Sequence, residues 1–284
     1  MSSAAVPQEE IPVSGPVPQI VRDSVTGLAL AAATANIIMQ LSRLPVGHGV
    51  AESKVESGRL DKHPVKRGRT TLSYVAVAML GTDAERALMR REVNRSHQQV
   101  RSGPGDPVAY NAFDRDLQLW VAACLYLGTE QIYELLHGEL DPETIEVLYQ
   151  HGARFGTTLQ VPQDMWPADR AAFEAYWNAS VALVRTDETT RSFLLDLTDL
   201  KFLPAPLAQL GGPVNRFVTT GFLPQEFRDE LGLPWSARSQ AHFDRYIRLT
   251  ARLNRALPPL IRAFPFNAYL WDFRRRVRAG RPIT

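Results

Sequence analysis

The stretch that decides the fold runs from residue 115 to residue 137 and reads RDLQLWVAACLYLGTEQIYELLH. Its middle, from Leu117 to Leu127, is apolar on every side of a helix, and such a helix is expected to be buried in a protein core. Asp114 or Asp116 can cap its first turn, because a carboxylate accepts hydrogen bonds from the free N–H groups there. The sequence therefore predicts one long, central helix with other helices packed around it.

Start signals predict further helices on both sides of the central one. Thr82 and Glu85 have the spacing of a capping box, and Asp141 followed by Pro142 places a proline at the first helical position. The expected helices cover residues 23–41, 70–80, 82–101, 114–137, 141–155, 167–184, 187–197 and 236–257.

Proline and glycine mark the segments that are expected to be irregular. They are concentrated in residues 45–68 and in residues 203–223, and the second segment is predicted to hold at most one short helix. The arginine-rich residues 274–281 could contact acidic lipid or nucleic acid, but they are expected to form a solvated tail.

The composition is that of a folded, helical protein. The chain has 284 residues, of which 45% are hydrophobic, and its 32 basic residues nearly balance its 30 acidic ones. That balance argues against a disordered chain and against a nucleic-acid partner. Because no stretch alternates like a strand, we expect an all-α fold with a single multi-helix domain over residues 20–284. Residues 1–19, with four prolines and no basic residue, are expected to be a disordered or extended tail.

Neither export nor membrane insertion is expected. The first residues lack the basic start and the apolar stretch of a signal peptide. The longest uncharged run, between Asp23 and Arg43, is interrupted by polar residues and is better explained as a buried helix than as a membrane span. One cysteine allows no internal disulfide, which fits a reducing compartment. We therefore predict a cytoplasmic protein without stable membrane insertion; its oligomeric state is left open.

His97 is the histidine with the strongest claim to a functional role. The common nucleotide-binding, hydrolase and HExxH motifs are absent, as is the CxxCH motif of covalent haem attachment. Met89, Val93, His97 and Val100 share one helix face, so the imidazole points inward along an apolar stripe. One interpretation is a core histidine satisfied by its neighbours; the other is an axial ligand of a non-covalent haem b.

Arg67 and Thr71 are the second pair of candidates. They are four residues apart and share a helix face. A buried arginine requires an anion, and a haem propionate is a suitable one. The alternative is an exposed arginine at a helix start, since Lys66, Arg67 and Arg69 form a charge run.

The order of these motifs resembles that of a known family. Arg67-x-x-x-Thr71, then SYVAVAMLGT at residues 73–82, then His97 is similar to the catalytic domain of rubber oxygenases (latex-clearing proteins) and MpaB-type oxygenases. Further matches follow in order: Tyr110 to Asp116 before Leu119-Trp120-Val121-Ala122; Met165-Trp166-Pro167 before Phe173 and Tyr176; and Gly221-Phe222-Leu223-Pro224 before Arg228 and Gly232-Leu233. The resemblance covers about residues 24–265.

This resemblance implies a fold, a cofactor and a reaction. The fold would have a globin-like helical core around a buried pocket that holds haem b, with His97 as the proximal ligand and with Arg67 and Thr71 in the pocket. The reaction would be the oxidation of an apolar, isoprenoid or lipid-like molecule by O₂ bound opposite His97. Rubber-cleaving members carry a lysine where this chain has Thr70, which argues against polyisoprene as the substrate. Glu52 matches their distal acid only with a one-residue gap and is the candidate catalytic base.

Two alternatives to an oxygenase remain at this stage. One is a non-catalytic haem-binding or small-ligand-binding protein that uses the same pocket. The other is a cofactor-free helical interaction protein in which His97 belongs to the core.

Overall fold

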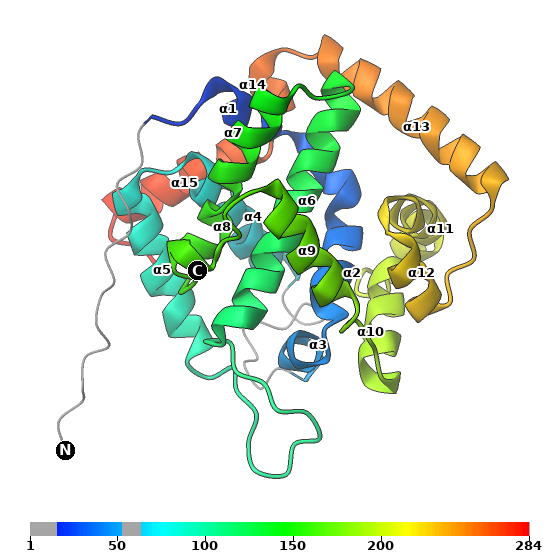
Figure 1. The fold of residues 1–284 in the computed structure, drawn as a ribbon, viewed down its shortest axis with the longest axis horizontal. Helices are drawn as coiled ribbons and strands as arrows, with labels where there is room; N and C mark the ends of the chain where they lie inside the picture. Colours follow the sequence, from blue (N-terminus) through cyan, green and yellow to red (C-terminus); the bar gives the residue numbers. More distant parts are fainter. Residues whose placement is uncertain (1–15, 53–63, 284) are drawn as a thin grey trace.

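The long helix α6 (Arg115–His137) runs through the centre of the molecule (Figure 1). The structure is a computed structural model that describes residues 16–52 and 64–283, so the predictions made for residues 1–15 fall outside it. Asp114 caps α6 by accepting hydrogen bonds from the backbone N–H groups of Asp116 and Leu117, as expected. The helix ends at Gly138, whose φ of 88° is unfavourable for other residues.

The other helices surround α6, and the described residues form no strand. In chain order they are α1 (Gln19–Ser24), the 3₁₀ helix η1 (Gly27–Ala32), α2 (Ala33–Leu41), α3 (Leu44–Ala51), α4 (Pro64–Leu80), α5 (Asp83–His97), α7 (Pro142–Gly152), α8 (Arg154–Thr157), the 3₁₀ helix η3 (Gln163–Met165), α9 (Arg170–Val181), α10 (Glu188–Thr198), α11 (Ala205–Phe222), α12 (Gln225–Leu231), α13 (Ala237–Ala256), α14 (Pro259–Arg262) and α15 (Phe266–Arg278). The all-α prediction is therefore confirmed, while the boundary between residues 19 and 20 stays a prediction.

Two apolar clusters lie on either side of α6. Tyr126 belongs to the cluster formed with α4, α5, α7, α8 and α15. Trp120 belongs to the cluster formed with α2 and with α10 to α13. Figure 1 shows these two groups of helices on opposite sides of α6. The helix is thus the common wall of both clusters, which explains why its sequence is apolar all round.

Helix α2 approaches α6 very closely at Gly128. A Cβ atom there would lie 2.5 Å from Nδ2 of Asn36, and that amide donates a 2.6 Å hydrogen bond to the carbonyl oxygen of Cys124. Glycine is favoured here because a side chain would displace the Asn36 amide and break this hydrogen bond.

Several segments differ from the sequence-based expectation. The predicted helix over residues 23–41 is broken after Ser24, where Thr26 caps η1. Residues 44–51 form α3, because Pro45 occupies a first-turn position that needs no N–H donor.

The second proline-rich segment and the C-terminal segment are also helical. Residues 205–222 form α11 with Pro213 inside, so packing against neighbouring helices outweighs the one backbone hydrogen bond that proline removes. Residues 266–278 form α15 rather than a solvated tail, because Phe266, Leu270 and Phe273 bury one face, largely against α4.

Among the described residues, no single helix is long and apolar enough to cross a bilayer. One pair of segments, Gly27–Leu41 and Leu44–Ala51, passes that test together but is bent by 112°.

Candidate functional site

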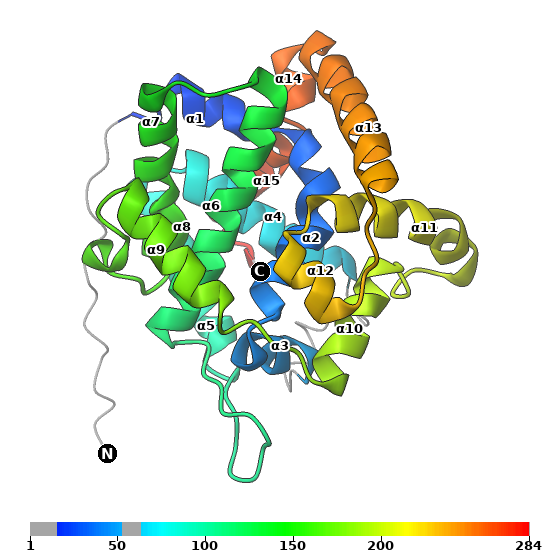
Figure 2. The same cartoon turned by 45° about the vertical axis from the view of Figure 1, so that its right-hand side comes forward.

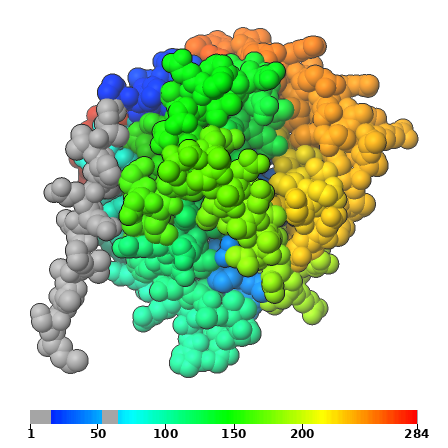
Figure 3. Space-filling model, in the orientation of Figure 1, coloured from blue at the N-terminus to red at the C-terminus, as the bar shows by residue number. Residues whose placement is uncertain are grey.

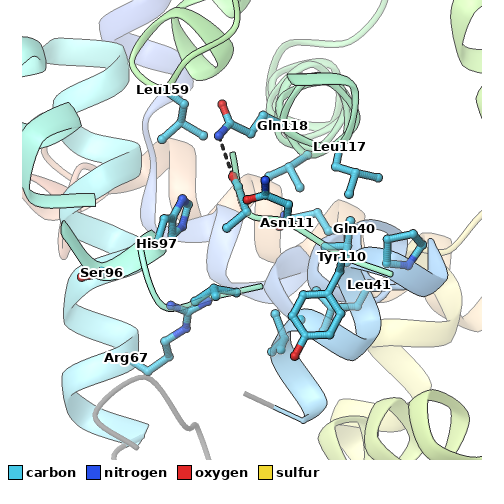
Figure 4. Close-up of a pocket in the computed structure, with 17 residues that line it drawn as sticks. Gln40, Leu41, Arg67, Ser96, His97, Tyr110, Asn111, Leu117, Gln118 and Leu159 are labelled. Carbon is cyan, nitrogen blue, oxygen red and sulfur yellow. Dashed lines mark hydrogen bonds between the residues drawn. The ribbon is translucent and has the colours of Figure 1, made fainter. Parts of the chain in front are cut away.

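A pocket of about 220 Å³ opens between α3, the start of α4, the end of α5 and the start of α6 (Figure 4). Its described lining consists mainly of apolar side chains and neutral amides. The lining residues are Gln40, Leu41, Pro45, Val46, Gly49, Val50, Arg67, Ser96, His97, Val100, Tyr110, Asn111, Ala112, Leu117, Gln118, Val121 and Leu159. None of them is an aspartate or a glutamate.

His97 is the last residue of α5 and lies on the wall of this pocket. Helix α5 begins with the predicted capping box, in which Thr82 and Glu85 bond each other's backbone N–H groups. Nδ1 of His97 is buried and makes no hydrogen bond within the described part of the chain. Burial and, to a smaller extent, the charge of Arg67 lower the pKa of His97 to about 4. The imidazole is therefore neutral at physiological pH and keeps its lone pair for a ligand.

Arg67 lies beside His97, on the second turn of α4. The guanidinium is partly buried, and burial lowers its pKa; no described carboxylate forms an ion pair with it. A buried cation without a counterion is costly, so this position favours a bound anion. The structure thus brings together two of the four residues singled out in the sequence.

The other two candidates lie outside the pocket. Thr71 is exposed and is not a lining residue. A step of four residues advances the helix by one turn and by about 40° around its axis, which separates Thr71 from the pocket wall. Glu52 follows α3, and its side chain, 39% exposed, accepts a hydrogen bond from His48. Neither Thr71 nor Glu52 lines the pocket formed by the described residues, and the roles expected of them stay predictions.

His48 forms a three-membered charged cluster with Glu52 and Asp187. Its Nδ1 lies 2.8 Å from Glu52, and its Nε2 lies 2.5 Å from Asp187, which caps α10. Burial opposes the charged imidazole, but the hydrogen bonds with Glu52 and Asp187 outweigh it and raise the pKa of His48. Burial also disfavours the Asp187 carboxylate, yet hydrogen bonds from Thr190 and His48 hold its pKa at about 2. This cluster joins α3, which forms one pocket wall, to α10.

Sequence reasoning missed Gln118, which holds the far wall of the pocket. Its side-chain N–H donates to the carbonyl oxygen of Ala112 at 2.7 Å, and its Oε1 accepts from the backbone N–H of Gln160 at 2.9 Å. These bonds keep the segment that carries Tyr110 and Asn111 over the pocket. A buried polar residue within an apolar helix was the available signal, since such a residue requires partners.

Comparison with known proteins places the chain in a family. The family described as "ER-bound oxygenase mpaB/B'/Rubber oxygenase, catalytic domain" matches residues 21–252. The chain belongs to this family. This MpaB/rubber oxygenase domain is a catalytic domain, so the chain is an enzyme of the oxygenase class.

Two mycobacterial proteins and one solved structure are similar to this MpaB/rubber oxygenase domain. The uncharacterized proteins Mb2261 of Mycobacterium bovis and Rv2237 of Mycobacterium tuberculosis are each 48% identical to it over 250 residues, which covers 88% of this chain and 98% of theirs. The structure of latex clearing protein in its closed state superimposes with a TM-score of 0.56 at 15% identity, covering 94% of this chain and 75% of that one. At 15% identity, this similarity shows a shared fold and nothing more.

The pocket of this MpaB/rubber oxygenase domain has the donor groups that a haem requires. A haem is a flat, apolar ring that is held by an axial ligand, such as a histidine nitrogen, and by partners for its two carboxylates. The pocket offers a neutral imidazole whose Nδ1 is buried and unpartnered, an arginine without a described acidic partner, and an apolar lining. The donor groups present therefore fit those that a haem needs.

Proposed function

We propose that this chain is a haem b-dependent oxygenase that oxidises an apolar small molecule with O₂. The observation that carries the proposal is the pairing of His97 and Arg67 in one apolar pocket, where the imidazole is held neutral and the guanidinium lacks a described acidic partner. Membership in a family of oxygenase catalytic domains supports the reaction class.

Each side chain of the pocket has a distinct task in this proposal. His97 would bind the iron of a non-covalent haem b, and Arg67 would pair with a propionate. When bound, haem supplies the oxygen chemistry. The side-chain amide of Asn111 can donate a hydrogen bond to a polar group of the substrate, whereas the amide of Gln118 is held by Ala112 and Gln160. Thr71 and Glu52 have no assigned role in this proposal, because neither lines the pocket.

The substrate class follows from the lining. Leu41, Val46, Val50 and Val121 present aliphatic surface, which suits an isoprenoid or lipid-like molecule. Polyisoprene is a poor candidate, because Thr70 stands where rubber-cleaving members have a lysine and its hydroxyl bonds the carbonyl oxygen of Lys66. Cytoplasmic location stays a prediction, in keeping with the unpaired, buried Cys124.

Family membership supports turnover, while one observation favours the alternative of a non-catalytic haem-binding protein. The described pocket lining holds no carboxylate that could act as a general base. A ferrous protein that forms a stable complex with O₂ and consumes no apolar substrate would support binding over turnover.

Hemin titration of the purified protein tests the proposal. We expect a Soret band that is lost or strongly shifted in His97→Ala and retained in His242→Ala, a matched change at an exposed histidine of α13. A colourless protein that fails to take up hemin would rule out a haem enzyme. Retention of the band in His97→Ala would rule out His97 as the ligand. A cofactor-free core role instead predicts that His97→Leu changes stability modestly and leaves the spectrum unchanged.

A further inference from the structure

Helix α13 presents a row of apolar side chains that no part of the described chain covers. Tyr246, Leu249, Leu253 and Leu257 follow the i, i+3, i+7, i+11 spacing of one helix face. Leu249 and Leu253 are 55% and 60% exposed, whereas Ile247 on the inner face is buried. The helix therefore has an apolar face in addition to the one that packs on the core.

Helix α11 carries a second exposed row. Leu207, Leu210 and Val214 are spaced i, i+3, i+7, and Leu210 is 80% exposed. Both helices contact η1, where Leu30 is also exposed. These six residues, Leu30, Leu207, Leu210, Val214, Leu249 and Leu253, are called the α11–α13 face below. Figure 2 shows α11 and α13 together along one edge of the molecule, and Figure 3 shows α13, in orange, at the surface.

The charge around this face is strongly one-sided. From residue 245 to residue 264 the chain has five arginines and no acidic residue. Arg245, Arg248 and Arg252 are exposed, and no described carboxylate forms an ion pair with them. Asp244, the acidic residue of α13, accepts a hydrogen bond from Gln240 at 2.7 Å. A partner that covers the face must therefore tolerate or neutralise positive charge.

That charge decides between the possible occupants. In a two-fold dimer the arginines of α13 would meet those of the second copy, and like charges at an interface are destabilising. An anionic bilayer instead satisfies both features, because leucines enter the boundary of the acyl chains while arginines reach the phosphate headgroups.

We propose that the α11–α13 face docks this chain on the surface of an anionic lipid bilayer. The chain lies on the membrane through α11, α13 and the exposed Leu260 and Ile261 of α14. The negative surface potential of such a bilayer attracts each arginine near it. The proposal does not depend on haem or on the reaction, since none of these residues lines the pocket.

Sedimentation of the full chain with lipid vesicles tests the docking. We expect binding to vesicles of phosphatidylcholine mixed with phosphatidylserine, and little binding to phosphatidylcholine alone or at high salt. The double variants L249S/L253S and R248E/R252E should each weaken binding at least about tenfold. Leu183→Ser and Arg22→Glu, changes at exposed residues outside the face, should bind like the wild type.

Three outcomes would overturn the proposal. The first is no binding to anionic vesicles at low salt, and the second is binding that both double variants leave unchanged. The third is a wild type that dimerises in analytical ultracentrifugation and becomes monomeric in L249S/L253S, which would assign the face to a second copy of the chain. All the substituted side chains are exposed, and unchanged thermal unfolding confirms that the variants are folded.

Discussion

The electrostatics of His97 and Arg67 are coupled. Both side chains leave water for a mainly apolar pocket, so each loses hydration that favours its charged form. The histidine adapts by remaining neutral, whereas the arginine stays charged because its pKa is too high to lose the proton. The pocket therefore combines a lone-pair donor with a fixed positive charge, which suits a ligand that has both a metal centre and a carboxylate.

Arg67→Leu should weaken hemin binding at least about tenfold, because a charge-assisted hydrogen bond is worth about 1.5–3 kcal/mol. The hemin affinity of Arg67→Lys should fall between those of Arg67→Leu and the wild type, since lysine keeps the charge but not the bidentate geometry. Affinity is measured by hemin titration, with Lys66→Leu on the same helix as the control. Equal affinities of Arg67→Leu and Lys66→Leu would show that Arg67 does not meet the propionate.

The cluster of His48, Glu52 and Asp187 should make stability depend on pH. The raised pKa of His48 gives stabilisation that is complete below pH 6.5 and is lost as the pH rises through the folded-state value. The lowered pKa of Asp187 gives stabilisation that is present above about pH 4 and is lost as the pH falls towards 2. The cluster therefore stabilises the folded state most between about pH 4 and the folded-state pKa of His48.

Asp187→Asn tests this window, because asparagine still caps α10 but carries no charge. We expect a loss of about 1 kcal/mol at pH 5, allowing for the partial exposure of the pair, and a smaller loss at pH 8. Urea unfolding at both values measures it. Asp199→Asn is the control. Asp199 pairs with Arg216, which does not titrate in this range, so the loss of unfolding free energy in Asp199→Asn should be the same at pH 5 and pH 8. A loss from Asp187→Asn that is equal at pH 5 and pH 8 would contradict the titration of His48.

At the scale of the helices, two glycines distinguish a close contact from an open helix surface. Gly128→Ala should destabilise the protein by about 1–3 kcal/mol, because the new Cβ would lie 2.5 Å from Nδ2 of Asn36. Gly68→Ala, on α4 with no atom within 4 Å of the new Cβ, should instead stabilise by about 0.5–1 kcal/mol through helix propensity. Thermal and urea unfolding measure both. A stabilising Gly128→Ala would show that the Asn36 side chain can move aside without cost.

The helices that the sequence predicts well are those with local start signals. The capping box of Thr82 and Glu85 and the Asp141-Pro142 pair fix the starts of α5 and α7 through side chains within one turn. The errors arise where distant packing decides, because Pro213 is tolerated inside α11 and the arginines of α15 lie on a helix that packs on α4.

The same distinction holds for the site. His97 could be singled out from the sequence because its stripe is local, with Val93 and Met89 one and two turns before it. Gln118 holds the pocket wall through a hydrogen bond with Gln160, and His48 joins its cluster through Asp187, which is 139 residues away. No periodicity within one helix contains such information. Arg67 is intermediate. Its spacing from Thr71 can be read from the sequence, but only the fold shows that it lies beside His97.

At the scale of the whole molecule, α6 separates two apolar clusters and helps to line the pocket. A ligand that contacts α3, α4, α5 and α6 together therefore contacts both halves of the core. Binding to the folded state alone stabilises it by about 2.7 kcal/mol at a ligand concentration one hundred times the dissociation constant. Because both halves share the site, that stabilisation should appear as a shift of the whole unfolding transition.

We therefore expect hemin to raise the midpoint of thermal unfolding by several degrees in the wild type and in His242→Ala, but little in His97→Ala. Hemin is itself apolar and anionic, so the α11–α13 face is the competing place for it to bind. The double variant L249S/L253S separates the two sites, because it removes apolar surface from the face and leaves the pocket intact. An increase that persists in L249S/L253S and is absent in His97→Ala assigns hemin to the pocket. An increase that survives in His97→Ala and disappears in L249S/L253S assigns it to the face and contradicts a haem site at His97.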